Sequence, residues 1–492
     1  MFLGIDLGLG SLKATVVADD GRLVGEASIA VITSTPAPAI AEQNPADWDE
    51  AMVMALAQLG RAGHLVSVKA ISFTAGTHST VLLDANDAVL RPAIMWSDQR
   101  SGAEAAELNA RFEDRLIAIA HNRAAPTWSI SPLYWLTRHE PETVAQTRRV
   151  VFVKDWLRGR LTGDRFTDWI DAQGSLLLDV DEGQWSEELC AAIGWNLATL
   201  PEVRNPTDLA GYVGSDAAAR YGLKEGTPVF VGTCDTAAEV WSAGAVEAGD
   251  TVVKLASAGV VNIISSHPTK RPDAPSKRFV VPGLYYALGA INSCASGHKW
   301  LTDLLLEDGQ GGGFDRLDAL AAQIEPGAGG VIFHPYLMGE RAPYWDPALR
   351  ASFVGLNLTH GRGHLVRAFY EGIAFALRDA AGPLREAGLV VGPAALIGGG
   401  AKSALWAQTI ADVLQVPLRK PVHGDASYAA ALIAAVGAGA FPDVVTAVRR
   451  CVSFTAEIKP RGEDRATYDR LFDRYRRTKE LLTALNHEIS AD

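Results

Sequence analysis

The chain has 492 residues, more than one compact core ordinarily contains, which predicts two large domains or three smaller ones. Hydrophobic residues make up 48% of the chain and charged residues 21%, a composition that argues against a disordered or fibrous protein. The formal net charge of −12 would repel the phosphate backbone of DNA or RNA, so no nucleic-acid partner is expected.

The first residues predict a tight β-hairpin. Strands are expected over residues 2–5 and 14–17, and the turn between them carries Gly8 and Gly10, which can adopt positive φ. The segment lacks the basic stretch of a secretory signal, and no apolar run in the chain is long enough to span a bilayer. We therefore expect a cytoplasmic protein that does not bind membranes. The four cysteines lie far apart, which favours reduced thiols.

A helix and further strands follow the hairpin. Asn44 provides a helix cap and Pro45 a first helical residue, and apolar residues at 48, 52, 56 and 59 continue with helical spacing. A buried strand is expected over residues 66–73. Strands that pair through a hairpin and then alternate with helices predict a mixed sheet flanked by helices.

The second half of the chain repeats this order. Residues 250–264 again predict a strand, a turn of small residues and a strand. Residues 228–235 and 394–400 each form an apolar strand that runs into glycine and then into a helix. The repetition predicts two similar domains, residues 1–246 and 247–492, although a chance likeness between hairpins would give the same pattern.

The most specific segment is residues 335–347, Pro-Tyr-Leu-Met-Gly-Glu-Arg-Ala-Pro-Tyr-Trp-Asp-Pro. It resembles the FGGY family of carbohydrate kinases. Further matches run in the family's order along nearly the whole chain, at residues 76–78, 96–100, 131–136, 232–235, 353–371 and 398–403. Within the family, the spacing from Thr77 and His78 to residues 91–100 is most similar to that of D-xylulose kinases.

This resemblance implies an α/β protein of two actin-like (ribonuclease H-like) ATPase domains with a cleft between them. The first domain would bind the sugar and carry the catalytic aspartate, and the second would bind the nucleotide. The implied reaction is ATP-dependent phosphorylation of D-xylulose to D-xylulose 5-phosphate. Another substrate, such as D-ribulose, L-ribulose, erythritol or glycerol, stays open because the chain departs from the family at Leu9, Pro132, Thr236, Phe369 and residues 256–259.

Asp235 is the predicted catalytic base, and the resemblance puts the family's catalytic aspartate at this position. A carboxylate placed on a reacting hydroxyl typically contributes about a hundred- to ten-thousand-fold. The alternative is a helix cap, because Asp235 precedes an expected helix over residues 236–241. Thr77, His78 and Thr236 complete the predicted sugar site with Asp235, since a sugar is recognised by polar groups that match its hydroxyls.

The remaining predicted contacts belong to ATP and Mg²⁺. Asp6 is assigned to Mg²⁺, because a hard carboxylate beneath phosphates suits that ion. Lys13 would place a charge on the β- and γ-phosphates, or would lie in solvent as lone lysines often do. Backbone amides and hydroxyls of the two hairpins and of a glycine-rich turn would cradle the rest of the nucleotide. These residues are Gly8, Gly10, Ser11, Ser257, Gly259, Gly399, Gly400 and Ala401.

Other interpretations stay open at this stage. An actin-like ATPase without a sugar substrate is the alternative from another class, and Leu9 in the first turn leaves open a kinase-derived regulator with weak activity. Residues 77–78 and 339–341 count against the ATPase, because they resemble sugar kinases. Asp98 and Arg100, with Trp96, are as compatible with a structural ion pair as with a sugar site. The sequence leaves a homodimer open.

Overall fold

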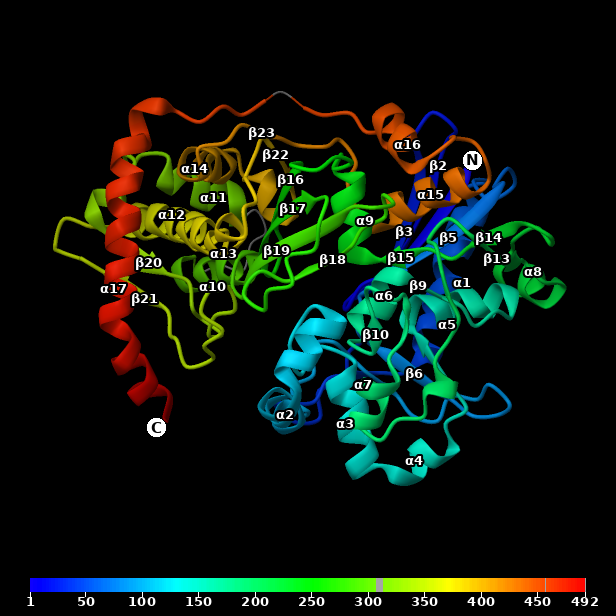
Figure 1. The fold of residues 1–492 in the computed structure, drawn as a ribbon. Coiled ribbons are helices and arrows are strands. Elements are labelled where there is room, and N and C mark those ends of the chain that lie inside the picture. Colours follow the sequence, from blue (N-terminus) through cyan, green and yellow to red (C-terminus); the bar gives the residue numbers. More distant parts are fainter. Residues whose placement is uncertain (307–312, 456, 492) are drawn as a thin grey trace.

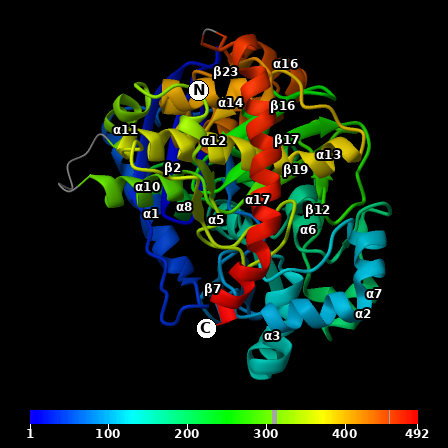
Figure 2. The ribbon, with the colours of Figure 1, turned by 90° about the vertical axis from the view of Figure 1, so that its left-hand side faces the viewer.

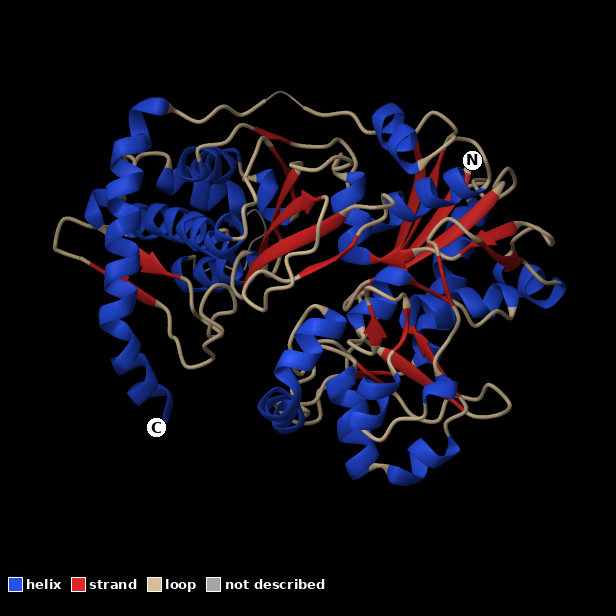
Figure 3. Ribbon diagram, viewed as in Figure 1, coloured by secondary structure: helices blue, strands red, loops and turns tan. Residues whose placement is uncertain are grey.

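Two lobes lie side by side in a computed structural model that describes residues 1–306, 313–455 and 457–491. Each lobe is built around a mixed β-sheet with helices on its faces (Figures 1 and 3). Over the described residues, none of the helices combines the length and apolar character needed to cross a membrane.

The first sheet has the order β13-β14-β5-β1-β2-β3, with β15 beside β5. Strands β1 to β3 are antiparallel neighbours, and β5 runs parallel to β1 on its other side. The predicted first hairpin therefore forms. The strands are β1 (Phe2–Leu7), β2 (Ser11–Val17), β3 (Leu23–Ala30), β5 (Ala70–Ala75), β13 (Leu209–Tyr212), β14 (Pro228–Phe230) and β15 (Thr233–Cys234).

The second sheet has the order β18-β19-β17-β16-β22-β23 and repeats that plan. Strands β16, β17 and β19 are antiparallel neighbours, and β22 runs parallel to β16. The second predicted hairpin is thus also present. The strands are β16 (Thr251–Leu255), β17 (Gly259–Ser265), β18 (Ser276–Arg278), β19 (Tyr285–Ile291), β22 (Ala394–Ile397) and β23 (Leu418–Arg419).

The repeat differs from the prediction in one pairing. Residues 228–235 were expected to correspond to residues 394–400, but β22 occupies the place that β5 has in the first sheet, next to the leading strand. Strand β14 lies one position further out, as β23 does in the second sheet. Sequence likeness between short apolar strands cannot reveal this order, because it is set by which strand pairs with which.

Helix α1 (Pro45–Arg61) forms as predicted. The Asn44 side chain accepts a hydrogen bond from the Ala46 amide, and the apolar stripe of the helix is buried against β2 and β3. The expected strand over residues 66–73 is displaced, since β5 begins at Ala70 and Val66 is 86% exposed. The chain turns at Gly63, whose φ is 77°, before it enters the sheet.

A third core fills the space between the two sheets. It joins residues of β1 and β15 to residues of β16 and β22 through helices α9 (Asp235–Ser242) and α15 (Ala426–Gly437). Helix α15 comes from the second half of the chain but packs on β1 and β5. A Cβ at Gly4 would lie 1.9 Å from the Ser427 carbonyl oxygen, so glycine is required for this close packing.

The other large helices cover the remaining faces. Helix α5 (Val153–Thr162) packs on the first sheet beside α1, and α12 (Arg362–Ala380) and α14 (Ala404–Leu414) contribute to the core of the second. The last helix, α17 (Arg465–Ala491), runs along the outer side of the second lobe, at the left of Figure 1 and toward the viewer in Figure 2. Below the first sheet, β4 (Glu42–Gln43), β6 (Thr80–Leu83), β7 (Ala93–Ile94) and β8 (Arg149–Phe152) form a four-stranded sheet near α2 (Gly102–Ala120) and α3 (Ile130–His139).

Candidate active site

The parallel strands of the first sheet bring the predicted acids together at their carboxyl ends. Strands β1, β5 and β15 run side by side and end at Leu7, Ala75 and Cys234. Asp6 accepts a 2.9 Å hydrogen bond from the Thr74 hydroxyl, and Asp235 follows directly after β15. Such strand ends are where open α/β sheets bind ligands.

A separate hollow lies at the other end of these strands. A cavity of about 550 Å³ is lined by Phe2 and Pro228, at the amino ends of β1 and β14, together with Gly437 at the end of α15. None of the predicted site residues lines it. We therefore place the candidate site at the carboxyl ends.

Asp235 is the first residue of α9, and one of its oxygens is fixed by the next residue. Oδ1 accepts hydrogen bonds from the backbone amide of Thr236 at 2.6 Å and from the Thr236 hydroxyl at 3.2 Å. Helix α9 has no side-chain cap, so Asp235 does not serve as the helix cap considered from the sequence. Oδ2 lies 4.0 Å from where a Cβ on Gly76 would stand, so it faces the loop that carries Thr77 and His78.

Several carboxylates share this end of the sheet. Burial raises the pKa of Asp6 well above its usual range, and the carboxylates of Asp235 and Glu239 raise it further. Burial also raises the pKa of Glu239, although the Lys254 ammonium opposes the rise. Lys254 comes from β16 and forms a close ion pair with Glu239 of α9. The leading strand of the second sheet therefore meets the acidic end of the first.

Lys13 does not lie free in solvent. Its Nζ is 2.9 Å from the Asp425 carboxylate and 2.8 Å from that of Glu26. Asp425 also caps α15 by accepting from the Tyr428 amide, which ties the predicted phosphate-binding lysine to the interlobe helix. A phosphate would have to share this cation with two carboxylates.

The turn of the first hairpin differs from the prediction in its backbone. Neither Gly8 nor Gly10 adopts positive φ. A Cβ on Gly10 would meet nothing within 4 Å, and one on Gly8 only the Ser11 carbonyl oxygen at 3.7 Å. The protein itself therefore leaves the space beside these glycines open. The Leu9 carbonyl oxygen accepts a 2.7 Å hydrogen bond from Gln43, which braces the turn.

The second hairpin and the glycine-rich turn lie against each other. Gly398 has a φ of 92°, and a Cβ there would stand 2.6 Å from the Leu255 carbonyl oxygen. The Gly399–Lys402 segment forms a 3-10 turn, and α14 starts only at Ala404, later than the sequence indicated. Ser257 is exposed at the tip of the hairpin.

Two of the predicted nucleotide glycines are closely packed against neighbouring side chains. A Cβ on Gly259 would lie 2.8 Å from Ile291, and one on Gly400 would lie 2.8 Å from both Leu255 and Trp406. Gly399 is different, because a Cβ there would meet nothing within 4 Å.

The predicted sugar residues lie in a buried turn. The Thr77 hydroxyl is buried without a hydrogen-bond partner, which marks it as a group that a ligand would satisfy. His78 has a φ of 77°, and its Nδ1 lies 2.7 Å from the Gly174 carbonyl oxygen. Burial, together with the Lys277 ammonium, lowers the pKa of His78 well below its usual value, so the ring is neutral.

Asp98 and Arg100 form the structural ion pair. The Asp98 carboxylate accepts two further hydrogen bonds from the amides of Ala41 and Arg100, and it is 1% exposed. Trp96 is different, because it is 39% exposed and lies beside Gly76, with its Nε1 3.3 Å from where a Cβ would stand. Trp96 therefore borders the predicted sugar turn.

Residues 340–341 hold a loop in the second lobe. Glu340 accepts hydrogen bonds from the amides of Asn292 and Arg341 at 2.8 Å each, and burial raises its pKa to about 7. Among the residues that the structure describes, neither side chain forms a hydrogen bond or ion pair with the acids of the first sheet, which agrees with a structural role.

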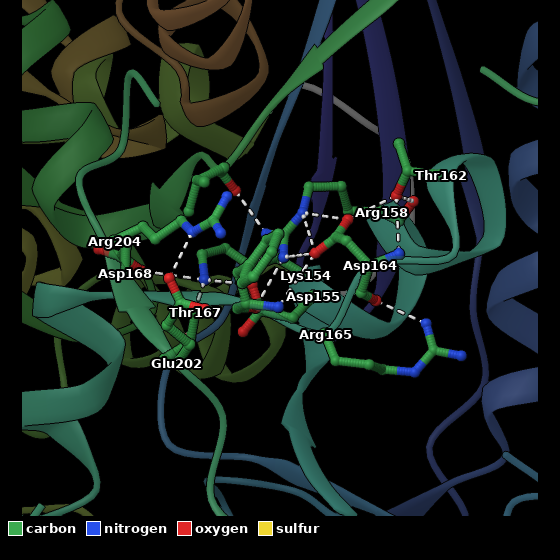
Figure 4. Close-up of polar contacts among 12 residues, drawn as sticks. Lys154, Asp155, Arg158, Thr162, Asp164, Arg165, Thr167, Asp168, Glu202 and Arg204 are labelled. Atoms are coloured by element: carbon green, nitrogen blue, oxygen red, sulfur yellow. Dashed lines mark hydrogen bonds and ion pairs between the residues drawn. The ribbon is translucent and has the colours of Figure 1, made fainter. Parts of the chain in front are cut away.

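A buried ionic network supports the strand that leads to Asp235 (Figure 4). Lys154 lies 2.7 Å from Asp155, 2.9 Å from Asp168 and 3.0 Å from Asp171. The Asp168 carboxylate accepts a 2.7 Å hydrogen bond from Thr233, two residues before Asp235. The same network thus anchors α6 (Trp169–Gly174), whose last carbonyl binds His78.

The sequence did not single out Glu239, Lys254, Asp425 or Lys277. Glu239 lies one helical turn after Asp235, a spacing that could have indicated a shared face. The others come from distant segments, and the sequence holds no signal that joins them to Asp235.

Comparisons with known proteins agree with this geometry. Residues 1–241 match the N-terminal domain, and residues 257–438 the C-terminal domain, of the FGGY family of carbohydrate kinases. The chain is 32% identical to a xylulose kinase of Bacillus subtilis over 98% of both chains. It is 33% identical to a xylulose kinase of Escherichia coli over 86% of this chain and 87% of the relative. The solved xylulose kinase from Rhodospirillum rubrum superposes with a TM-score of 0.90, at 31% identity and 99% coverage of both chains, which confirms the predicted fold class.

Proposed function

Because the chain belongs to the FGGY family of carbohydrate kinases, and is therefore a sugar phosphotransferase that uses ATP, we propose that its acceptor is D-xylulose, phosphorylated at the terminal hydroxyl to D-xylulose 5-phosphate. The names of the full-length relatives support this substrate. The single observation that carries the chemistry is the position of Asp235, with one oxygen held by Thr236 and the other facing the Gly76 loop.

In the proposed reaction, Asp235 Oδ2 accepts the proton of the terminal hydroxyl as the oxygen attacks the γ-phosphorus of ATP. A new P–O bond to the sugar forms, the bond to the β-phosphate oxygen breaks, and ADP leaves with that electron pair. Thr236 keeps Oδ1 occupied, so that Oδ2 remains the free acceptor. Transfer of this kind depends on position and charge neutralisation more than on covalent catalysis.

We propose that Asp6 holds Mg²⁺ together with the phosphates of ATP. The residues fit, because Asp6 is held by Thr74 and faces the negative charges of Asp235 and Glu239, which a divalent cation would offset. Within the described residues, no three such side chains gather to hold a metal by themselves, so the phosphates would supply the other ligands. When bound, Mg²⁺ supplies charge neutralisation at the β- and γ-phosphates.

We propose that residues 1–246 bind the sugar and that residues 247–492 bind the nucleotide, with the first hairpin of residues 1–246 facing the phosphates. The open space beside Gly8, Gly10 and Gly399 supports a nucleotide that lies between the first hairpin and the glycine-rich turn. Gly259 and Gly400 would support these loops by packing, while Ser11 and Ser257 would contribute hydroxyls. Ala401, whose amide donates to the Gly398 carbonyl oxygen, would line the turn beside the nucleotide.

The test is the rate of ADP release with a panel of acceptors: D-xylulose, D-ribulose, L-ribulose, erythritol and glycerol. We expect D-xylulose to give the highest kcat/KM. Without an acceptor, the protein should hydrolyse little ATP. A different best acceptor would replace D-xylulose within the kinase assignment. ATP turnover that no acceptor stimulates would instead favour an actin-like ATPase. Omission of Mg²⁺ should abolish transfer, and Asp6→Asn should raise the Mg²⁺ concentration needed for half-maximal rate.

A further inference from the structure

The proposed sugar site receives one buried cation from the other lobe. Lys277 lies on β18, at the edge of the second sheet, yet its Nζ is 3.4 Å from His78 Nε2 and 4.7 Å from the centre of the Trp128 ring. The residue is only 4% exposed. Its side chain therefore crosses from the second lobe into the turn that carries the predicted sugar residues.

Within the described part of the chain, Lys277 is unusual because it is buried without a direct ion pair. Burial lowers its pKa, and the more distant charges of Asp171, Asp235 and Asp168 oppose that fall. No ion pair with a carboxylate forms at Lys277 over residues 1–306, 313–455 and 457–491, and His78 is the one hydrogen-bond partner of its Nζ there. Lys154, which is also buried, pairs with Asp155 and Asp168 (Figure 4) and with Asp171. A buried ammonium that makes no direct ion pair is costly, and a hydrogen bond to a ligand oxygen would offset that cost.

The strand that carries Lys277 is also held in place. Gln173 donates a 3.1 Å hydrogen bond to the Ser276 carbonyl oxygen and accepts a 2.8 Å hydrogen bond from the Arg278 amide, on either side of Lys277. The next residue, Gly174, accepts from His78 through its carbonyl oxygen. The end of α6 thus fixes both His78 and Lys277 by backbone contacts.

The two ring nitrogens of His78 are both engaged. Nδ1 donates to the Gly174 carbonyl oxygen, which leaves Nε2 as the acceptor for one N–H of Lys277. An ammonium has three donors, so two remain for other oxygens. The unpartnered Thr77 hydroxyl lies near the His78 ring. A Cβ on Gly174 would be 2.9 Å from the Thr77 hydroxyl and 3.1 Å from His78 Nδ1.

We propose that Lys277 is a specificity-determining residue that donates a hydrogen bond to an acceptor oxygen of the sugar at the end remote from the phosphorylated hydroxyl, with His78 as its positioning residue. This inference rests on the proposed function. Asp235 faces Gly76, and Lys277 reaches His78 two residues further along the chain, so both side chains border the turn that carries the predicted sugar residues. The required chemistry is a strong acceptor oxygen, such as the carbonyl of a ketose or the carboxylate of a sugar acid.

Lys277→Met is the test, because methionine has a similar volume and no charge. We expect the KM for D-xylulose to rise about ten- to a hundredfold, the range for a lost hydrogen bond to a charged group, while the KM for ATP stays within about twofold. Removal of an unpaired buried charge should leave the thermal midpoint unchanged or raise it, and D-xylulose should no longer raise it further. Lys270→Met, at an exposed lysine paired with Asp181, is the matched control and should change none of these values.

Acceptors that differ at one carbon identify the oxygen. Xylitol lacks the carbonyl of D-xylulose, so the preference of the wild type for D-xylulose over xylitol should narrow in Lys277→Met. If D-xylonate is a better acceptor than D-xylulose for the wild type and shows the larger rise in KM in Lys277→Met, then Lys277 binds the substrate, but the substrate is not a ketopentose. An unchanged KM for every acceptor, or an equal loss for ATP and sugar, overturns the role of Lys277. A wild type that phosphorylates no acceptor overturns the proposed function itself, and the inference with it.

Discussion

Replacement of Asp235 by asparagine changes one atom of the proposed base and little else. The donors of Thr236 remain satisfied by the amide oxygen, so the new NH2 group takes the place of Oδ2 and faces the Gly76 loop. A donor then stands where the sugar hydroxyl needs an acceptor for its proton. We expect kcat to fall about a hundred- to ten-thousand-fold, which corresponds to about 3–5 kcal/mol of activation free energy.

The same substitution should not weaken the fold. Asp235 repels Asp6 and Glu239, so its neutralisation removes an unfavourable interaction at the end of the sheet. Initial rates against D-xylulose and ATP would measure the loss, and titration calorimetry would show whether ATP still binds. Asp216→Asn is the control, because Asp216 lies exposed in the first turn of α8 (Ser215–Tyr221).

Two results would refute this reasoning. If Asp235→Asn keeps more than about a third of the wild-type kcat, the carboxylate is not the base. If ATP binding falls in step with kcat while D-xylulose binding stays, Asp235 belongs to the nucleotide or metal site.

Three further predictions follow from named contacts. His78→Ala should raise the KM for D-xylulose and leave the affinity for ATP nearly unchanged, as measured by titration calorimetry; equal losses for both ligands would contradict it. Lys154→Met should lower the free energy of unfolding by about 3–5 kcal/mol in urea denaturation, because three buried aspartates lose their cation, whereas exposed Lys299→Met should cost less than about 1 kcal/mol. Glu340→Gln should gain stability relative to the wild type as pH rises. Burial raises the pKa of Glu340 from 4.5 to about 7, so the folded protein holds a proton that the unfolded chain releases, and wild-type stability falls between those pH values. The difference should reach about 3 kcal/mol between pH 5 and 8, and parallel stability profiles for the two proteins would contradict it.

Local patterns in the sequence predicted much of the fold. The two hairpins and helix α1 with its Asn44 cap formed because turn residues, capping and apolar spacing act over a few residues. The order of strands was less accessible. Strand β22 corresponds to β5 and not, as expected, to residues 228–235, because pairing joins segments more than a hundred residues apart.

The same distinction between local patterns and distant pairing applies to the site. Asp235, Thr236 and Glu239 are local to one strand end and one helix, so the sequence alone could place Asp235 and its neighbour at that strand end. The partners of Lys13 and His78 could not be predicted, because Asp425 and Lys277 reach them from the other half of the chain. Sequence thus determined which residues have suitable chemistry. Tertiary structure decided which of them meet, since burial and distance between remote segments control charge balance and the free hydrogen-bonding groups.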